Sequence, residues 1–105
     1  MKFLVLASPG PIPAPPGVMA EAFKASKEWM AEQVKAGVVD CVFGFAAGGG
    51  GCGIVNASSG EELQALLVGS PLGPFSTFDL KPLADFNSGI DLLIKQLTAA
   101  AAAKG

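Results

Sequence analysis

Five prolines between residues 9 and 16 restrict most strongly what this chain can fold into. The apolar run before them, residues 2–8, is short and nearly continuous, which is typical of a strand buried on both faces. Because proline lacks an N–H and fixes its own φ angle, residues 8–17 cannot form a helix or an inner strand. We therefore expect a central first strand followed by a stiff, polyproline-like connection.

The segment after the prolines has helical periodicity. Apolar residues recur every three to four positions over residues 18–36, and Gly37 is placed to end the helix. Runs rich in valine and phenylalanine predict strands over 38–46 and 52–57. The glycine run 48–51 between them leads into a strand, not a helix, so we interpret it as a hairpin tip and not as a phosphate loop. Such a tip can also act as a mobile flap over a cavity.

A second helix is predicted by a capping-box pattern, in which Ser59 is followed three positions later by Glu62. Gly69 is placed to end this helix. Its buried stripe is formed by three leucines, Leu63, Leu66 and Leu67. Apolar and polar residues then alternate over 75–81, which predicts a fourth strand closed by Pro82.

The last part of the chain predicts a third helix from about Ser88. Its apolar face is formed by Ile90, Leu93, Ile94 and Leu97. The alanine-rich end, residues 99–105, is expected to fray. The order of elements is β-α-β-β-α-β followed by an extra helix, so residues 1–105 predict one α+β domain of ferredoxin-like topology.

The composition favours self-association. Of the 105 residues, 50% are hydrophobic and only 15% are charged. A domain of this size buries a smaller share of its surface than a larger one does, and extended exposed apolar patches mark interaction surfaces. We therefore expect a homodimer or a larger homo-oligomer.

The residue types that are missing from the sequence exclude several classes of function. The sequence has no histidine, arginine or tyrosine, and its formal net charge is −2. The basic patches of nucleic-acid-binding proteins are therefore missing, and so are the imidazoles of most metal sites and catalytic triads. We expect no metal, no cofactor and no nucleic-acid partner. No run approaches the roughly 18 apolar residues of a membrane span, so a cytoplasmic location without a membrane partner is expected.

Several short motifs carry a resemblance to a known family. Residues 58–63 read Ser-Ser-Gly-Glu-Glu-Leu, and they are followed by Pro71-Leu72 and by Lys81-Pro82-Leu83 with Phe86. Together with the order of elements, these motifs resemble the muconolactone isomerase-like branch of the dimeric α+β barrel superfamily. The resemblance implies a barrel-like dimer of two facing four-stranded sheets, with a ligand cavity between sheet and helices. Members of the superfamily include cofactor-free isomerases, cofactor-independent monooxygenases and proteins of unknown activity.

Three functions follow from this resemblance. The first hypothesis is a cofactor-free isomerase that acts by proton transfer on a small, cyclic, carbonyl-bearing molecule. The alternative is a non-catalytic small-ligand binding or accessory protein of the same fold, which the missing histidine, arginine and tyrosine favour. The third is a cofactor-independent monooxygenase. A cavity lined only by apolar groups would favour the binding protein.

Two strand carboxylates are the candidate catalytic bases, Asp40 first and Asp79 in reserve, with an exposed strand-end carboxylate as the alternative for each. Asp40 interrupts an apolar run, where burial would raise its pKa and suit it to abstract a proton beside a carbonyl group. Asn56 is a candidate hydrogen-bond donor to the resulting oxyanion, although a local turn-capping role is the alternative.

Lysines and aromatic residues complete the candidate substrate-binding set. Lys2 opens the first strand and Lys81 closes the fourth, and the ferredoxin-like topology brings these two ends together as an anion site. Solvated edge lysines are the alternative. Trp29, Phe43 and Phe78 offer apolar area to a flat or cyclic ligand, with a purely core role as the alternative.

The two cysteines, Cys41 and Cys52, lie at equal distances from the expected centre of the hairpin. This placement suggests cross-strand neighbours on one face of the sheet. Reduced, structural thiols are the expectation, because no cationic neighbour is in view to lower a thiol pKa. A disulfide, where the Cβ geometry permits one, and a redox or nucleophilic role are the alternatives.

Overall fold

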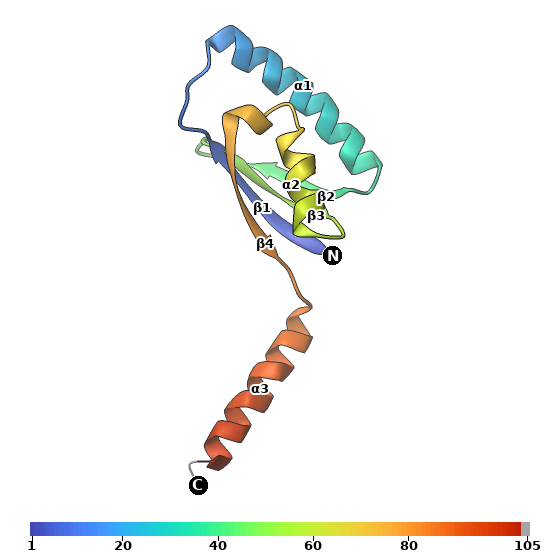
Figure 1. Cartoon of the computed structure of the whole chain (residues 1–105), viewed down its shortest axis with the longest axis vertical. Helices are drawn as coiled ribbons and strands as arrows, with labels where there is room; N and C mark the ends of the chain where they lie inside the picture. The colour runs from blue at the N-terminus through green and yellow to red at the C-terminus, as the bar shows by residue number, and fades with distance from the viewer. Residues whose placement is uncertain (104–105) are drawn as a thin grey trace.

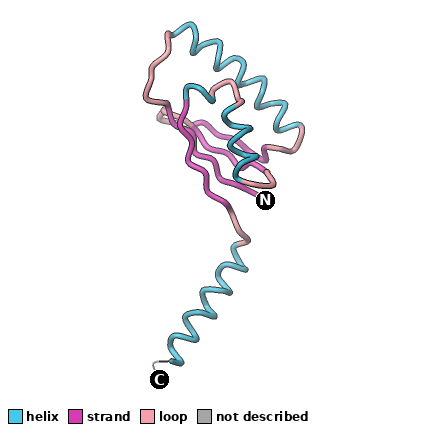
Figure 2. The backbone as a smooth tube through the Cα atoms, in the orientation of Figure 1, coloured by secondary structure: helices cyan, strands magenta, loops and turns pink. Residues whose placement is uncertain are grey.

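A computed structural model describes residues 1–103. It consists of a four-stranded sheet, two helices that cover one face of it, and a third helix that projects away from it (Figures 1 and 2). The elements, in chain order, are β1 Lys2–Pro9, α1 Pro16–Lys35, β2 Val39–Gly44, β3 Gly51–Asn56, α2 Gly60–Val68, the 3-10 turn η1 Gly73–Phe75, β4 Ser76–Pro82 and α3 Phe86–Ala103.

The sheet has the strand order β2-β3-β1-β4, and every neighbouring pair is antiparallel. β1 is central, as its continuous apolar run predicted. This order is that of the ferredoxin-like fold, so the predicted α+β class and the extra C-terminal helix are confirmed.

The irregular connection between β1 and α1 is shorter than the predicted residues 8–17. Pro9 is the last residue of β1 and pairs only with Ser76 of β4, whereas Pro16 and Gly17 belong to the first turn of α1. Both positions suit proline. At Pro9, β1 has already passed the end of β3 and has one neighbouring strand left, and the first turn of a helix leaves its backbone N–H groups without intrahelical partners. The irregular connection therefore covers only 10–15.

The core lies between the helices and one end of the sheet. Side chains alternate across a strand, so Phe3 and Val5 of β1 face the helices and are buried, while Leu4 and Leu6 face the other way. Leu63 of α2 is fully buried against this core. The remaining buried apolar residues are Val39, Val55, Ala57 and Leu67. We call the opposite side of the sheet, which no helix covers, the open face (Figure 1).

The hairpin between β2 and β3 corrects the expected pairing of the cysteines. Cys41 lies opposite Ile54 and Cys52 lies opposite Phe43, so the two free thiols share one face but stand diagonally, two positions apart. The loop covers 45–50, and its centre lies one residue later in the chain than the sequence suggested.

Glycine is required at the last position of this loop. Gly50 has a φ of +121°, and a Cβ atom there would stand 1.9 Å from the carbonyl oxygen of Ala7. The loop therefore packs its backbone directly against the end of β1, an approach that only a residue without a side chain permits.

Helix α3 extends away from the body, which gives a molecule 66 Å long and less than 30 Å across (Figure 1). All its described residues are exposed, including the predicted apolar face. Residues 99–103, expected to fray, form its last part, while residues 104–105 of that expected tail lie outside the described residues. None of the helices within 1–103 is both long and apolar enough to cross a membrane.

Candidate functional site

A cavity of about 510 Å³ lies between the helices and the sheet, at the end of the sheet far from α3. Its existence follows from side-chain size. The helix-facing positions at this end of β1 and β3 are Ala7, Gly51 and Gly53, whereas Phe3 and Val55 fill the same layer at the other end. The sheet therefore provides a full core at one end and an unfilled space at the other.

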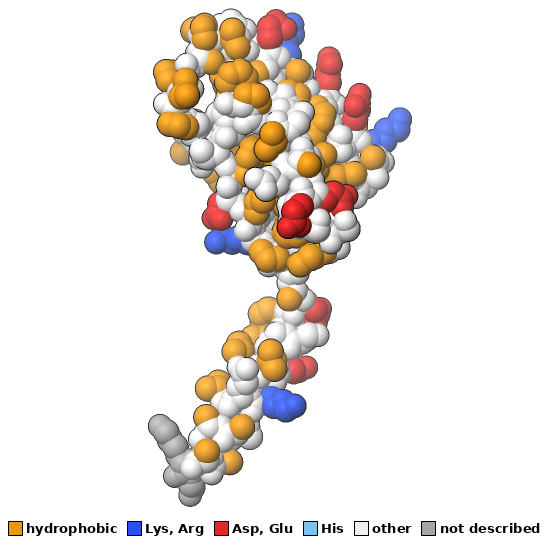
Figure 3. All heavy atoms as spheres, in the orientation of Figure 1, with side chains coloured by type: hydrophobic (Ala, Val, Ile, Leu, Met, Phe, Trp, Pro, Cys, Tyr) orange, Lys and Arg blue, Asp and Glu red, His pale blue; other side chains and the backbone are white. Residues whose placement is uncertain are grey.

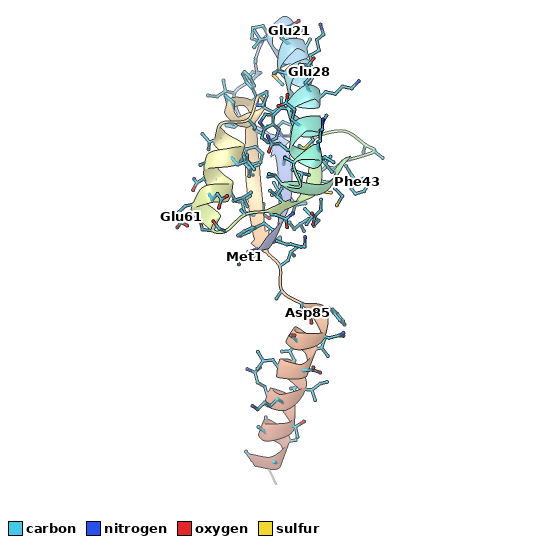
Figure 4. The ribbon with its side chains drawn as sticks, turned by 90° about the vertical axis from the view of Figure 1, so that its right-hand side faces the viewer. Met1, Glu21, Glu28, Phe43, Glu61 and Asp85 are labelled. Atoms are coloured by element: carbon cyan, nitrogen blue, oxygen red, sulfur yellow. The ribbon has the colours of Figure 1, made fainter. Side chains whose placement is uncertain are left out.

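Helix α1 forms one wall of the cavity. Met19, Phe23, Ser26 and Met30 recur at helical spacing along its inner side, and we call them the α1 stripe. Trp29, the single tryptophan of the chain, lies beside this stripe and also lines the cavity. Glu21 and Glu28 of the same helix (labelled in Figure 4) are exposed and do not line it.

The opposite wall comes from the end of α2, the segment after it, and β4. Leu66 and Leu67 contribute apolar surface, and Phe78 of β4 faces the helices beside them. Ser70 is buried and its Oγ donates a hydrogen bond to the carbonyl oxygen of Leu67, at 2.6 Å. Ser76, at the start of β4, also lines this wall.

The lining is apolar apart from serine hydroxyls and backbone groups. Hydrophobic side chains gather over the sheet end far from α3 and along α3 itself (Figure 3). Within residues 1–103, no lysine, aspartate or glutamate lines the cavity. The site can therefore enclose an apolar molecule, but its walls hold no charged acid or base.

The structure divides the predicted site residues into two groups. Trp29 and Phe78 line the cavity. Phe43 only borders it, because Phe43 pairs with Cys52 in the row that faces the open side of the sheet and is largely exposed. The charged and amide candidates do not line it: Lys2, Asn56, Asp79 and Lys81 occupy strand positions that alternate with the helix-facing ones, and Asp40 stands at a β-bulge of β2. The predicted base and oxyanion donor are thus on the far side of the sheet from the cavity.

Three of these residues form one hydrogen-bonded cluster, which we call the Lys2–Asp40–Asn56 cluster. The Lys2 ammonium donates to Asp40 Oδ2 and, at 2.9 Å, to Asn56 Oδ1. The Asn56 amide donates to Asp40 Oδ1 at 2.7 Å and to the carbonyl oxygen of Gly37 at 3.1 Å. The register explains this meeting, because Lys2 pairs directly with Asn56 and the bulge brings Asp40 beside them.

The expectation that the pKa of Asp40 is raised is wrong. Hydrogen bonds from Lys2 and then from Asn56 stabilise the ionised carboxylate, so the pKa of Asp40 lies below its usual value of 3.8. The carboxylate is exposed, and desolvation does not outweigh these contacts. Asp40 is therefore ionised at neutral pH and is a weak base there.

Lys81 and Asp79 form a separate pair on the open face. Lys81 Nζ stands 3.5 Å from Asp79 Oδ2, and both side chains are exposed. Lys81 pairs with Leu4, which is only two residues from Lys2 on β1. Lys2 and Lys81 therefore lie at the same end of the sheet, as predicted. Each ammonium, however, has a carboxylate partner.

Two cavity serines, Ser26 and Ser76, were not predicted from the sequence. A signal was present for both, because each is a hydroxyl residue that interrupts an apolar pattern. Ser26 stands three residues after Phe23 and four before Met30, and Ser76 begins the helix-facing row that continues with Phe78. A polar residue that interrupts an apolar stripe is a candidate for contact with a molecule in the space that the stripe lines.

Fold and site together define a small α+β protein with a ferredoxin-like sheet and an apolar, ligand-sized cavity. Among solved structures, muconolactone isomerase is similar, with a TM-score of 0.71 and 20% sequence identity over 81% of this chain and 90% of that one. The 5-chloro-2-hydroxyhydroquinone dehydrochlorinase TftG from Burkholderia phenoliruptrix AC1100, in complex with 2,5-dihydroxybenzoquinone, is also similar. Its TM-score is 0.63 and its identity 16%, over 84% and 98% of the two chains.

The resemblance expected from the sequence is thereby confirmed for the fold: this chain has the fold of muconolactone isomerase. No family model matches the chain, and no curated protein matches its sequence.

Proposed function

We propose that this protein binds a small, largely apolar, cyclic molecule in the cavity between α1, α2 and the sheet. The observation that carries this proposal is the cavity itself, which at about 510 Å³ has the volume of a small-molecule site and is walled by apolar and aromatic side chains. The fold neighbours support it, because one is named for a lactone isomerase activity and the other was solved with a cyclic, carbonyl-bearing compound.

Filling the cavity tests this function. Naphthalene is a suitable apolar probe, and its binding can be followed by amide chemical shifts and by the fluorescence of Trp29, the one tryptophan and a cavity residue. Ala7→Leu places a larger side chain on the cavity floor, and we expect at least a tenfold loss of naphthalene affinity. Ala31→Leu, on the exposed side of α1, is the matched control.

The proposal fails if naphthalene produces no saturable shifts in the wild-type protein. It also fails if Ala7→Leu, folded as judged by its spectrum, binds the probe as well as Ala31→Leu does.

A second candidate is cofactor-free isomerisation by proton transfer, with Asp40 as base, Asp79 in reserve and Asn56 as oxyanion donor. The Lys2–Asp40–Asn56 cluster favours it, because a carboxylate, an ammonium and an amide lie within hydrogen-bond distance of one another. This reaction would take place on the open face, since these groups do not line the cavity. It would use a base that is ionised but weak at neutral pH.

Isomerisation of α-angelica lactone tests this candidate. A base removes a proton from the α-carbon, the double bond moves into conjugation with the carbonyl, and a proton is returned to the γ-carbon, which changes the ultraviolet absorbance. If Asp40 is the base, Asp40→Asn lowers the rate about 10²- to 10⁴-fold, whereas Asp79→Asn leaves it unchanged. Equal rates in the wild type and both variants would exclude the carboxylate mechanism.

We further propose that the partner of this chain is a second copy of itself. The open face presents the half-buried side chains of Leu4, Leu6 and Ile54 without a covering helix, and α3 presents a second, exposed apolar surface. In projection, each surface measures about 300–400 Å². Stable interfaces bury about 800 Å² per partner, so one interface that uses both surfaces approaches the usual size.

A further inference from the structure

We propose that the hydroxyls of Ser26 and Ser76 hold oxygen atoms of the ligand, so that the ligand is an uncharged ring compound with carbonyl or hydroxyl groups. This inference rests on the proposed binding function and assigns the polar contacts of the same cavity. Among the described residues, four serines line this largely apolar space. Ser70 bonds to its own backbone, and Ser8 is exposed in the strand row that faces the open side of the sheet. Ser26 and Ser76 remain, and they come from elements far apart in the sequence.

Ser26 belongs to the α1 stripe, where Met19, Phe23 and Met30 are the other members. It is half-buried, as Met19 and Met30 are. An alanine would serve helix formation better at this position and add apolar contact, because serine has the lower helix propensity and its hydroxyl stays accessible to water. Packing of α1 therefore does not account for a serine here.

Ser76 reaches the same cavity from β4. It pairs with Pro9 and stands in the helix-facing row with Phe78 and Leu80, whereas its neighbour Thr77 faces the other side of the sheet. Ser76 is half-buried and Thr77 is exposed. Of these two neighbouring hydroxyl residues, Ser76 therefore faces the cavity and Thr77 faces the open side of the sheet.

The hydroxyls of Ser26 and Ser76 differ from that of Ser70 in their hydrogen bonding. Within residues 1–103, no hydrogen bond involves the Oγ of Ser26 or of Ser76, whereas Ser70 in the same wall donates to a carbonyl three residues earlier. A helical serine commonly bonds back to its own helix in that way. Ser26 does not, so its donor and its acceptor sites are both open to a molecule in the cavity.

The other residues of the cavity wall indicate that the ligand is uncharged. An anion enclosed here would leave water and meet serine hydroxyls and apolar side chains in place of a lysine, because the described lysines all lie outside the lining. Burying an unpaired charge is far more costly than burying a carbonyl that accepts a hydroxyl hydrogen bond. The cavity therefore selects neutral oxygen-bearing rings over carboxylates.

Three bicyclic probes test this inference by amide-shift titration: naphthalene, which has no oxygen, coumarin, which is a neutral lactone, and coumarin-3-carboxylate, which is an anion. We expect the ratio of coumarin affinity to naphthalene affinity to fall about 2- to 10-fold in Ser26→Ala and in Ser76→Ala. Naphthalene affinity itself stays unchanged, which also shows that the variants are folded. Thr77→Ala, which removes a hydroxyl from the other face, leaves the ratio as it is.

The outcomes separate this inference from the binding function. Naphthalene binding with an unchanged ratio in the Ser26→Ala, Ser76→Ala double variant overturns the serine contacts and leaves the cavity function standing. A fall in only one single variant overturns the role of the other serine. Coumarin-3-carboxylate is expected to bind at least tenfold more weakly than coumarin, and equal or tighter binding overturns the uncharged class. Failure of all three probes to bind removes the proposed function and this inference together.

Discussion

At the scale of single residues, short-range hydrogen bonds lower the pKa of three carboxyl groups. The pKa of Asp40 is lowered by Lys2 and Asn56, that of Glu62 by the hydroxyl and backbone N–H of Ser58, and that of Asp85 by the backbone N–H and hydroxyl of Ser88. A folded-state pKa below the unfolded one adds stability above the unfolded value, near pH 4, and that stability is lost as pH falls through the folded pKa.

We predict that Lys2→Met raises the pKa of Asp40 toward its usual value of 3.8, because the largest cause of its lowering is the hydrogen bond from Lys2. Titration of the Asp40 carboxyl carbon by NMR measures this change. Lys81→Met is the matched control, since Lys81 contacts Asp79 and not Asp40. Stability should also decline less steeply below about pH 4 in Asp40→Asn than in the wild type. An Asp40 pKa that is the same in Lys2→Met and the wild type would contradict the assignment.

At the scale of elements, two helices have comparable N-terminal caps but different surroundings. Ser59 Oγ accepts from the backbone N–H of Glu62 at 3.2 Å at the start of α2. Asp85 accepts from the backbone N–H of Ser88 at 2.9 Å at the start of α3, where the chain leaves the sheet (Figure 4). Of these two helices, only α2 packs buried leucines against the core. The cap of α2 therefore contributes to the stability of the whole body, whereas the cap of α3 stabilises only that helix.

We predict that Ser59→Ala lowers the free energy of unfolding of the body by about 1 kcal/mol. Asp85→Ala should leave that free energy within about 0.5 kcal/mol of the wild type, because surface changes away from packed features have small effects. It should instead speed amide hydrogen exchange in the first turns of α3. Urea unfolding, followed by Trp29 fluorescence, and hydrogen exchange measure the two effects. Equal losses of global stability would show that α3 is coupled to the body.

At the scale of the whole molecule, two apolar surfaces remain uncovered in the single chain. The open face and α3 both present large hydrophobic side chains, including Phe43 at 64% and Leu97 at 70% exposed. One layer of helices covers only one face of a sheet, so a second layer has to come from another chain.

We predict a dimer at micromolar concentration by light scattering. Ile54→Glu places a charge in the middle of the open face and should shift the protein toward the monomer. Ile12→Glu, at a residue 80% exposed in the proline connection, is the control and should leave the mass unchanged. Removal of residues 86–105 should weaken the dimer as well. A wild-type monomer, or a dimer that tolerates Ile54→Glu, would contradict this assembly.

Local rules explain why so much of the architecture could be predicted from the sequence. The end of α1 at Gly37, which has a φ of +77°, the cap at Ser59 and the strand runs all follow from the backbone preferences of nearby residues. Side-chain periodicity likewise identified the buried stripe of α2. The order of elements and the ferredoxin-like class followed from these features.

Two features were decided only by the tertiary structure: which side chains share a face of the sheet, and where small residues of neighbouring strands leave a cavity. The position of the hairpin centre determined that Cys41 faces Ile54, and the bulge in β2 determined that Asp40 joins Lys2 on the open face. A shift of one residue moves a side chain to the other face of a sheet, and no local pattern encodes it. The cavity likewise required three small residues from two strands, Ala7, Gly51 and Gly53, to meet beneath α1. Its lining therefore became visible only once the strands were paired, because cavity shape depends on residues distant in the sequence that meet only in the folded chain.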